Sequence, residues 1–182
     1  FKREGLKEFS IAVNISSKQF NVELPQRLDN LISETGLSPS DISLEITEGV
    51  AMAAIESNFQ LMEAFRNRGH RISVDDFGTG YSSLAYLKRF PVDTLKIDQA
   101  FIRVLALDSD DFVITKAIID LGRSLGLKII AEGIETASQL EILRQLGCNF
   151  GQGYYFQKAC SAQDIVEAYQ ARQPLGKAIL PQ

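Results

Sequence analysis

The stretch Ile72-Ser-Val-Asp-Asp-Phe-Gly78 joins a short apolar run to two carboxylates and a glycine. The apolar side chains of Ile72 and Val74 predict a buried β-strand. Gly78 permits the tight turn that leads out of the strand. A similar pattern, in which an apolar run ends in a polar residue, recurs along the chain, and this recurrence indicates the class of fold.

Six strands are predicted from such runs, five clearly and the last more weakly. They cover residues 11–15, 42–46, 72–75, 95–97, 127–130 and 150–156. The polar residues at their C-terminal ends are Asn14, Glu45, Asp75, Lys96, Glu132 and Gln152. Helical patterns separate the strands; one ends at Gly36, another begins with a capping box at Thr136 and Gln139, and the last follows Ser161.

Alternation of strand and helix predicts a parallel sheet with helical crossovers. An open doubly wound sheet gathers its ligands at one switch point and needs polar residues on only a few strands. In a (β/α)₈ barrel every strand end points at one mouth, so six polar ends favour the barrel. Because 182 residues fall below the usual ~200 of that fold, we expect an α/β barrel with about six β/α units, incomplete at the N-terminus, in one domain over residues 1–182.

Composition excludes several functional classes. The net charge is −4 and no basic stripe occurs, so binding to DNA is not expected. No apolar run approaches the ~18 residues of a membrane span, so we expect no direct membrane insertion. The two cysteines match no zinc or redox spacing. We therefore expect a cytoplasmic location, or the cytoplasmic part of a membrane-anchored parent.

The strand ends offer oxygen ligands for hard cations. Glu45, Asp75, Asp76 and Glu132 supply carboxylates, and Asn14 and Gln152 supply amide oxygens. Such donors suit Mg²⁺, Mn²⁺ or Ca²⁺, and a pair of ions can clamp the attacking and leaving oxygens of a phosphodiester. Lys96 would then hold the water or neutralise a phosphate oxygen. The alternatives are ordinary: Asn14 as a turn residue, and Lys96 as a surface lysine or the partner of Asp98.

The turn after the third strand is the other candidate binding element. Its residues are Phe77, Gly78, Thr79, Gly80, Tyr81 and Ser82, whose glycines, hydroxyls and amides suit an anionic ligand. The alternative is a tight turn that needs glycine only for its geometry. Glu48 and Glu135 lie just past the strand ends and are expected to support this site. His70 is expected in a loop, and Cys148 as an inert core thiol.

Six motifs in the same order resemble those of the EAL domain family. They are Val13-Asn-Ile-Ser16, Leu44-Glu-Ile-Thr-Glu48, Val74-Asp-Asp-Phe-Gly-Thr-Gly-Tyr-Ser-Ser-Leu84, Leu95-Lys-Ile-Asp98, Ala131-Glu-Gly-Ile-Glu-Thr136 and Gln152-Gly-Tyr-Tyr155. The resemblance covers nearly the whole chain and implies a bacterial (β/α)₈-barrel phosphodiesterase. Such enzymes hydrolyse the second messenger cyclic di-GMP to linear pGpG with Mg²⁺ or Mn²⁺, and Ca²⁺ is expected to inhibit.

The resemblance also implies a role for each strand-end residue. Asn14, Glu45 and Asp75 correspond to metal ligands, and Asp76 to a ligand of the second metal. Lys96, Glu132 and Gln152 correspond to residues that assist the water or the metals, with Glu132 the candidate general base. Glu48 corresponds to the residue that braces the loop over residues 77–83 and couples the site to dimerisation. The implied partners are cyclic di-GMP, a second copy in a homodimer, and sensory or GGDEF-type domains of a parent protein.

One departure from the family pattern separates two interpretations. The Glu-Ala-Leu tripeptide that names the family, with its metal-binding Glu, does not occur in the sequence, nor does the arginine that follows it. In the first interpretation the chain is part of an active enzyme; by itself it would be weakly active or inactive and would have an unpaired strand edge at residues 11–15. In the second interpretation it is a catalytically inactive receptor or scaffold. We favour the enzyme because the other motif positions are present. From a different class, Lys96 at a strand end would also suit a Schiff-base enzyme.

Overall fold

The structure, a computed structural model, describes residues 9–80, 84–107 and 109–171. Contacts between residues group the chain into two compact units. Ser10–Lys96 together with Leu125–Leu127 form what we call the N-terminal unit. The described parts of Ile97–Ser124 and Lys128–Gln182 belong to the C-terminal unit. Each unit carries its own hydrophobic core.

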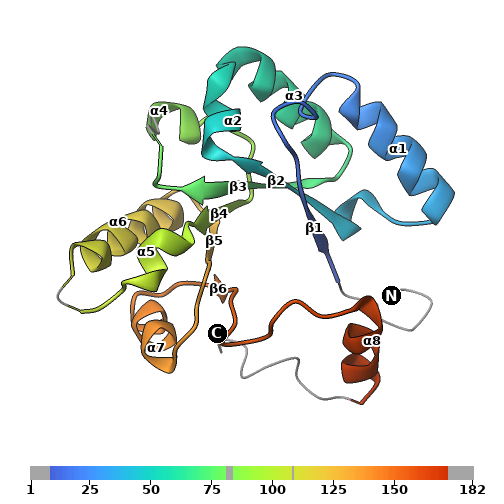
Figure 1. Cartoon of the computed structure of the whole chain (residues 1–182). Helices are drawn as coiled ribbons and strands as arrows, with labels where there is room; N and C mark the ends of the chain where they lie inside the picture. Colours follow the sequence, from blue (N-terminus) through green and yellow to red (C-terminus); the bar gives the residue numbers. More distant parts are fainter. Residues whose placement is uncertain (1–8, 81–83, 108, 172–182) are drawn as a thin grey trace. The chain divides into compact units, whose positions relative to one another are not determined.

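Hydrogen bonds join six strands in the order in which they occur in the sequence (Figure 1). The strands are β1 (Ile11–Asn14), β2 (Ile42–Thr47), β3 (Arg71–Phe77), β4 (Thr94–Ile97), β5 (Lys128–Ala131) and β6 (Phe150–Gly151). The pairs β1–β2, β2–β3 and β5–β6 are parallel. A doubly wound sheet would reverse its order at a switch point, whereas this consecutive order is that of a (β/α)₈ barrel. The expected fold class is therefore confirmed, with six strands among the described residues.

Helices follow the strands as the sequence predicts, with two short additions. The N-terminal unit contains α1 (Leu24–Thr35), η2 (Pro39–Asp41), α2 (Glu48–Ala53), α3 (Ile55–Asn67) and α4 (Leu84–Leu87). The C-terminal unit contains α5 (Gln99–Arg103), α6 (Asp110–Ser124), α7 (Ala137–Gln145) and α8 (Ala162–Gln170). The predicted capping box of α7 is present, and Ser161 caps α8. Sequence periodicity did not reveal α2 and α5 because each is shorter than two helical turns.

Strand alternation builds the core of the N-terminal unit. Leu44 and Ile46 on β2, like Val74 on β3, are completely buried. Helix α3 packs against β3 and contributes Met62 and Phe65, which are also completely buried. Because alternate side chains point to opposite faces of a strand, the residues between these apolar ones face the other side. Glu45 and Asp75 lie at such positions.

The core of the C-terminal unit forms around β5. Helix α6 packs against β5 and against α5. Ile102, Ile119, Ile129 and Leu143 are completely buried in it. Cys148 lies in the same unit, where burial raises the pKa of its thiol to about 11. A thiol so far from ionisation is a poor nucleophile, in agreement with its predicted role as a core residue.

The predicted length of the sixth strand needs correction. The sixth strand comprises only Phe150–Gly151, because the segment after it turns at Gly153, whose backbone lies directly against that of Ile134. His70 lies between α3 and β3, as predicted, but it is only 3% exposed.

Among the described residues, no helix combines the length and apolar character that crossing a bilayer requires.

The His70 imidazole is held in an apolar environment. Its ring packs edge-on against Phe65, with the two centroids 5.9 Å apart. Neither ring nitrogen has a partner in regular hydrogen-bond geometry. Burial lowers the pKa of His70 below its ordinary value of 6.5; the nearby backbone groups of Ile42 and Pro39 and the charge of Asp29 oppose this shift, and Arg68 adds to it. The imidazole is therefore neutral in the folded protein at neutral pH.

This environment predicts a pH dependence of stability. As pH falls through 6.5, the unfolded chain gains a proton at His70 before the folded protein does, so the free energy of unfolding decreases. Urea denaturation at about pH 7.5 and about pH 5.5 should show this loss, and the loss should be smaller in His70→Phe. An equal loss in both proteins would show that other groups cause it.

Candidate metal centre

Sheet register places three predicted ligands on one face of the N-terminal unit. Asn14 on β1 pairs with Glu45 on β2, and Glu45 pairs with Ser73 on β3. Asp75 lies two residues after Ser73 and therefore points to the same face. Asn14 is exposed, whereas Glu45 and Asp75 are buried. Two carboxylates and an amide from three successive strands thus share this face.

Lys96 on β4 connects the two buried carboxylates. Its Nζ donates to Glu45 Oε2 at 2.7 Å and lies 3.2 Å from Asp75 Oδ1. The lysine side chain is only 3% exposed. Burial of a charged group is costly unless it is paired and hydrogen-bonded, and these two contacts offset that cost.

The contacts of Lys96 decide between two of the alternatives. Lys96 is buried and is therefore not the surface lysine of one alternative. Asp98, the partner in the other alternative, caps α5, where its Oδ1 accepts the backbone N–H of Ala100 at 2.7 Å. A Schiff-base enzyme needs a neutral amine, whereas the Lys96 ammonium is held by two carboxylates. The geometry therefore disfavours a nucleophilic lysine.

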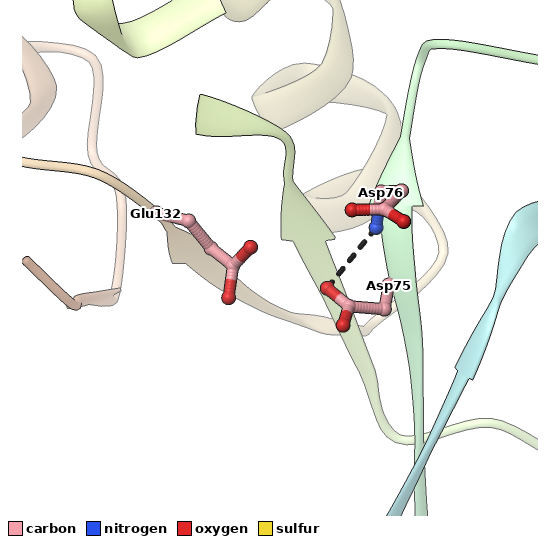
Figure 2. A group of neighbouring side chains, drawn as sticks. All are labelled: Asp75, Asp76 and Glu132. Atoms are coloured by element: carbon pink, nitrogen blue, oxygen red, sulfur yellow. Dashed lines mark hydrogen bonds between the residues drawn. The ribbon is translucent and has the colours of Figure 1, made fainter. Parts of the chain in front are cut away.

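Asp76 leaves the regular path of its strand. It has a φ of 54°, unlike the other non-glycine residues that the structure describes. Its backbone N–H donates to Asp75 Oδ1 at 3.0 Å (Figure 2). A left-handed residue breaks the alternation of side chains along a strand, and aspartate adopts this conformation more readily than most residues. The conformation explains how two adjacent carboxylates can both act as ligands.

Two predicted residues belong to the C-terminal unit. Glu132 directly follows β5, where its backbone N–H donates to Ile97 O at 3.2 Å. Gln152 directly follows β6 and is exposed; its N–H donates to Ala131 O at 2.9 Å. Figure 2 shows Asp75, Asp76 and Glu132 with their strands; each offers a carboxylate oxygen as a metal ligand.

Glu48 contacts the loop after β3, as predicted. Its Oε2 accepts the Gly78 N–H at 3.0 Å, and its side chain is almost completely buried. Gly80 lies so close that a Cβ there would be 2.6 Å from Glu48 Oε1. Gly78 has a φ of 100°, which only glycine adopts without strain. Gly78 is therefore required by its backbone angle, and Gly80 by the closeness of the Glu48 carboxylate.

The remaining predicted loop residues differ in their surroundings. Phe77 is buried at the end of β3, so packing accounts for it. The Thr79 hydroxyl donates to Asp76 O at 2.9 Å and stabilises the turn. Glu135 is exposed, and its backbone N–H donates to Gln139 Oε1 at 2.8 Å. Tyr81 and Ser82 lie outside the described residues.

The donor set fits a hard divalent cation. Asn14, Glu45, Asp75 and Asp76 present only amide and carboxylate oxygens, and such ligands suit Mg²⁺, Mn²⁺ or Ca²⁺. The only histidine in the sequence is His70, which is buried in the core against α3. An oxygen-rich site of this kind, at the carboxyl ends of parallel strands, is typical of metal-dependent α/β-barrel enzymes.

The family of the chain follows from comparison with known proteins. The family model of the EAL domain matches residues 1–159. The chain belongs to the EAL domain family. The resemblance of its motifs is therefore confirmed over most of its length.

Characterised relatives are longer proteins. The chain is 46% identical over 163 residues to a Pseudomonas aeruginosa protein named bifunctional diguanylate cyclase/cyclic di-GMP phosphodiesterase MucR. This match covers 89% of the chain and 24% of MucR. The chain thus spans about a quarter of the length of this relative.

Solved structures share the fold. The phosphodiesterase of PaMucR in complex with c-di-GMP superposes with a TM-score of 0.84 at 46% identity, covering 88% of this chain and 72% of that one. Klebsiella pneumoniae BlrP1 in a manganese and cyclic di-GMP complex gives a TM-score of 0.80 at 26% identity, covering 87% and 41%. These structures confirm the barrel class, and the second contains a divalent metal together with the dinucleotide.

Two features of the site had no clear signal in the sequence. The pairing of Lys96 with Glu45 joins residues 51 positions apart. Ser73, which is buried beside Glu45, was not recognised because a serine within a strand carries no distinctive pattern. Only the register of neighbouring strands reveals both.

The close approach of Gly80 to Glu48 predicts the effect of adding a methyl group. In Gly80→Ala the Glu48 carboxylate must move and weaken its bond to Gly78, so we expect a loss of about 1 kcal/mol in the free energy of unfolding. Urea denaturation measures this loss.

Gly49→Ala is the matched control. A Cβ at Gly49 meets nothing within 4 Å, and the residue lies in α2. Alanine favours a helix over glycine by up to about 1 kcal/mol, so this variant should be at least as stable as the wild type. Equal stability of Gly80→Ala and the wild type would contradict the bracing role of Glu48.

Proposed function

We propose that the chain, as an EAL-type domain over residues 1–182, is a hydrolase that opens cyclic di-GMP to linear pGpG in bacterial second-messenger signalling. The observation that carries this proposal is the face formed by Glu45, Asp75 and Lys96, where family motifs from three strands meet. The phosphodiesterase activity in the name of MucR and the c-di-GMP bound in the PaMucR structure support the choice of substrate. Water attacks one phosphorus atom, the bond to the 3′ oxygen breaks, and the phosphate stays on the 5′ side.

The ligands are assigned from the donor set. Asn14, Glu45 and Asp75 would hold one divalent cation, and Asp76 would hold the second. Bound Mg²⁺ or Mn²⁺ supplies Lewis-acid activation of water and neutralises phosphate charge. The left-handed backbone of Asp76 is the feature that lets both adjacent carboxylates serve.

Three further residues would act on the substrate. Glu132 is the candidate general base that accepts the proton of the attacking water. Lys96 stabilises negative charge on the phosphate oxygens, and Gln152 orients the water. The loop assigned to substrate binding would comprise Phe77, Gly78, Thr79, Gly80, Tyr81 and Ser82, with the buried Phe77 anchoring its start. Glu48 and Glu135 support that loop.

Partners and location belong to the same proposal. The domain would work as a homodimer, in a parent protein with sensory or GGDEF-type domains, in the cytoplasm or on the cytoplasmic side of a membrane. The relative MucR is named for both a diguanylate cyclase and a phosphodiesterase activity in one protein, which supports the expectation of a second domain.

The decisive test combines binding and product analysis. Calorimetric titration with cyclic di-GMP in Ca²⁺ and then in Mg²⁺ measures binding, and chromatography measures linear product. Linear product in Mg²⁺ is the expected result. Binding without turnover in Mg²⁺ would instead identify a receptor, and absence of binding in both metals would contradict the assigned ligand.

Asp75→Asn should remove most of the activity. The substitution keeps the size of the side chain but removes a carboxylate from the ligand set, so kcat/KM should fall by at least about 100-fold. Asp120→Asn is the control, because Asp120 lies exposed on α6 and pairs with Lys116. Near-normal turnover of Asp75→Asn would refute the assignment.

Metal exchange gives an independent prediction. Removal of divalent ions with a chelator should abolish hydrolysis, and Mg²⁺ or Mn²⁺ should restore it, whereas Ca²⁺ should inhibit. Flexible Ca²⁺ coordination differs from the stricter octahedral geometry of Mg²⁺. Full turnover in the chelator would exclude a metal-dependent reaction.

A further inference from the structure

The Lys96 ammonium occupies oxygens that the proposed metal also needs. Its Nζ is 2.7 Å from Glu45 Oε2 and 3.2 Å from Asp75 Oδ1. Both carboxylates are nearly buried, with side chains 8% and 12% exposed. The two residues that contact Lys96 are therefore two of the four that are assigned as metal ligands.

Because Glu45 and Asp75 are buried, their negative charges require a cation nearby, whether or not a metal is bound. Two negative groups on neighbouring strands repel each other, and little solvent is present to screen them. An ammonium between them offsets the repulsion and the loss of hydration. A divalent cation bound to the same oxygens satisfies the same requirement, and two cations repel when they compete for one pair of carboxylates.

We propose that Lys96 is a built-in placeholder for the divalent cation. The ammonium holds Glu45 and Asp75 in place before the metal binds, and it leaves Glu45 Oε2 when the metal takes that oxygen. The inference rests on the proposed function, because that function assigns Glu45 and Asp75 as ligands. It goes further by giving Lys96 a role in metal affinity that precedes any reaction.

The exchange has a consequence for the phosphodiester. Lys96 is anchored on β4, all four residues of which are buried, so the ammonium cannot withdraw far into solvent. Once it has left Glu45, the ammonium can contact a phosphate oxygen, which is an anionic group that the substrate brings. Metal and phosphodiester should therefore each strengthen the binding of the other.

Ca²⁺ binding without nucleotide tests the placeholder. Lys96→Met keeps much of the length of the side chain and removes its charge. Calorimetry should show Ca²⁺ binding to Lys96→Met about tenfold more tightly than to the wild type, because no ammonium has to be displaced. Without Ca²⁺ the variant should melt at a lower temperature than the wild type. Saturating Ca²⁺ should raise the melting temperature of the variant by more than it raises that of the wild type.

Lys116→Met is the matched control. Lys116 is half exposed on α6 and pairs with Asp120. The substitution removes the same charge from the chain and should leave both Ca²⁺ affinity and the Ca²⁺-induced shift in melting temperature unchanged.

The outcomes separate this inference from the proposed function. Equal or weaker Ca²⁺ binding by Lys96→Met, with binding by the wild type intact, overturns the placeholder and leaves the metal site standing. Folded wild type and Lys96→Met that both fail to bind Ca²⁺ overturn the metal site and the placeholder together.

A measurement on the wild type keeps the proposal falsifiable if Lys96→Met does not fold. Side-chain ammonium signals of ¹⁵N-labelled lysines are recorded by NMR, and Lys96 is assigned by the signal that Lys96→Arg loses. Saturation with Ca²⁺ should shift or broaden the Lys96 signal while that of Lys116 stays unchanged. An unchanged Lys96 signal would show that Ca²⁺ does not displace the ammonium, and this result overturns the placeholder. It would do so even if Lys96→Met binds Ca²⁺ more tightly, because removal of a positive charge can raise Ca²⁺ affinity through weaker electrostatic repulsion alone.

Discussion

The burial of two carboxylates on adjacent strands is the constraint on which the site depends. Glu45 and Asp75 lie on the face of β2 and β3 opposite Leu44, Ile46 and Val74, which pack toward helix α3. This alternation makes the hydrophobic core and the acidic face two sides of the same strands. Removal of one partner from such a buried ionic group typically costs 3–5 kcal/mol, because the other charges stay uncompensated. The stability of the N-terminal unit and the chemistry of its acidic face are therefore linked through Lys96.

The backbone conformation at Asp76 gives its side chain a direction that regular strand alternation would not give it. A regular strand would turn Asp76 away from Asp75, yet its φ of 54° changes the direction of the side chain. Unusual backbone conformations of this kind persist where surrounding contacts hold them. Glu48 provides such contacts through the Gly78 N–H, and Thr79 does so through the Asp76 carbonyl. The turn after β3 is thus held from two sides next to the proposed ligands.

The proposed function agrees with the way the fold separates its core from its strand ends. Helices and apolar strand faces are common to many α/β barrels, whereas chemistry in these folds resides in the residues at the strand ends. The family model matches residues 1–159, a range that includes all of these strand ends. The loop contacts of Glu48 show how a change in the turn after β3 would reach Asp76 and Asp75 without altering the core.

The sequence by itself determined the positions of the strands, the barrel class and the residues of the acidic face. These features are local, because apolar alternation, capping residues and glycine turns depend only on residues a few positions apart. The polar residue at the end of each strand is therefore visible in the sequence itself. Only the tertiary structure decided that Lys96 bonds to Glu45, that Asp76 is left-handed, that His70 is buried and that the last strand is short. The Lys96–Glu45 bond and the early end of the last strand depend on contacts between residues far apart in the chain, which strand packing brings together. The conformations at Asp76 and His70 depend on how a short segment folds against its surroundings, which residue types alone do not specify.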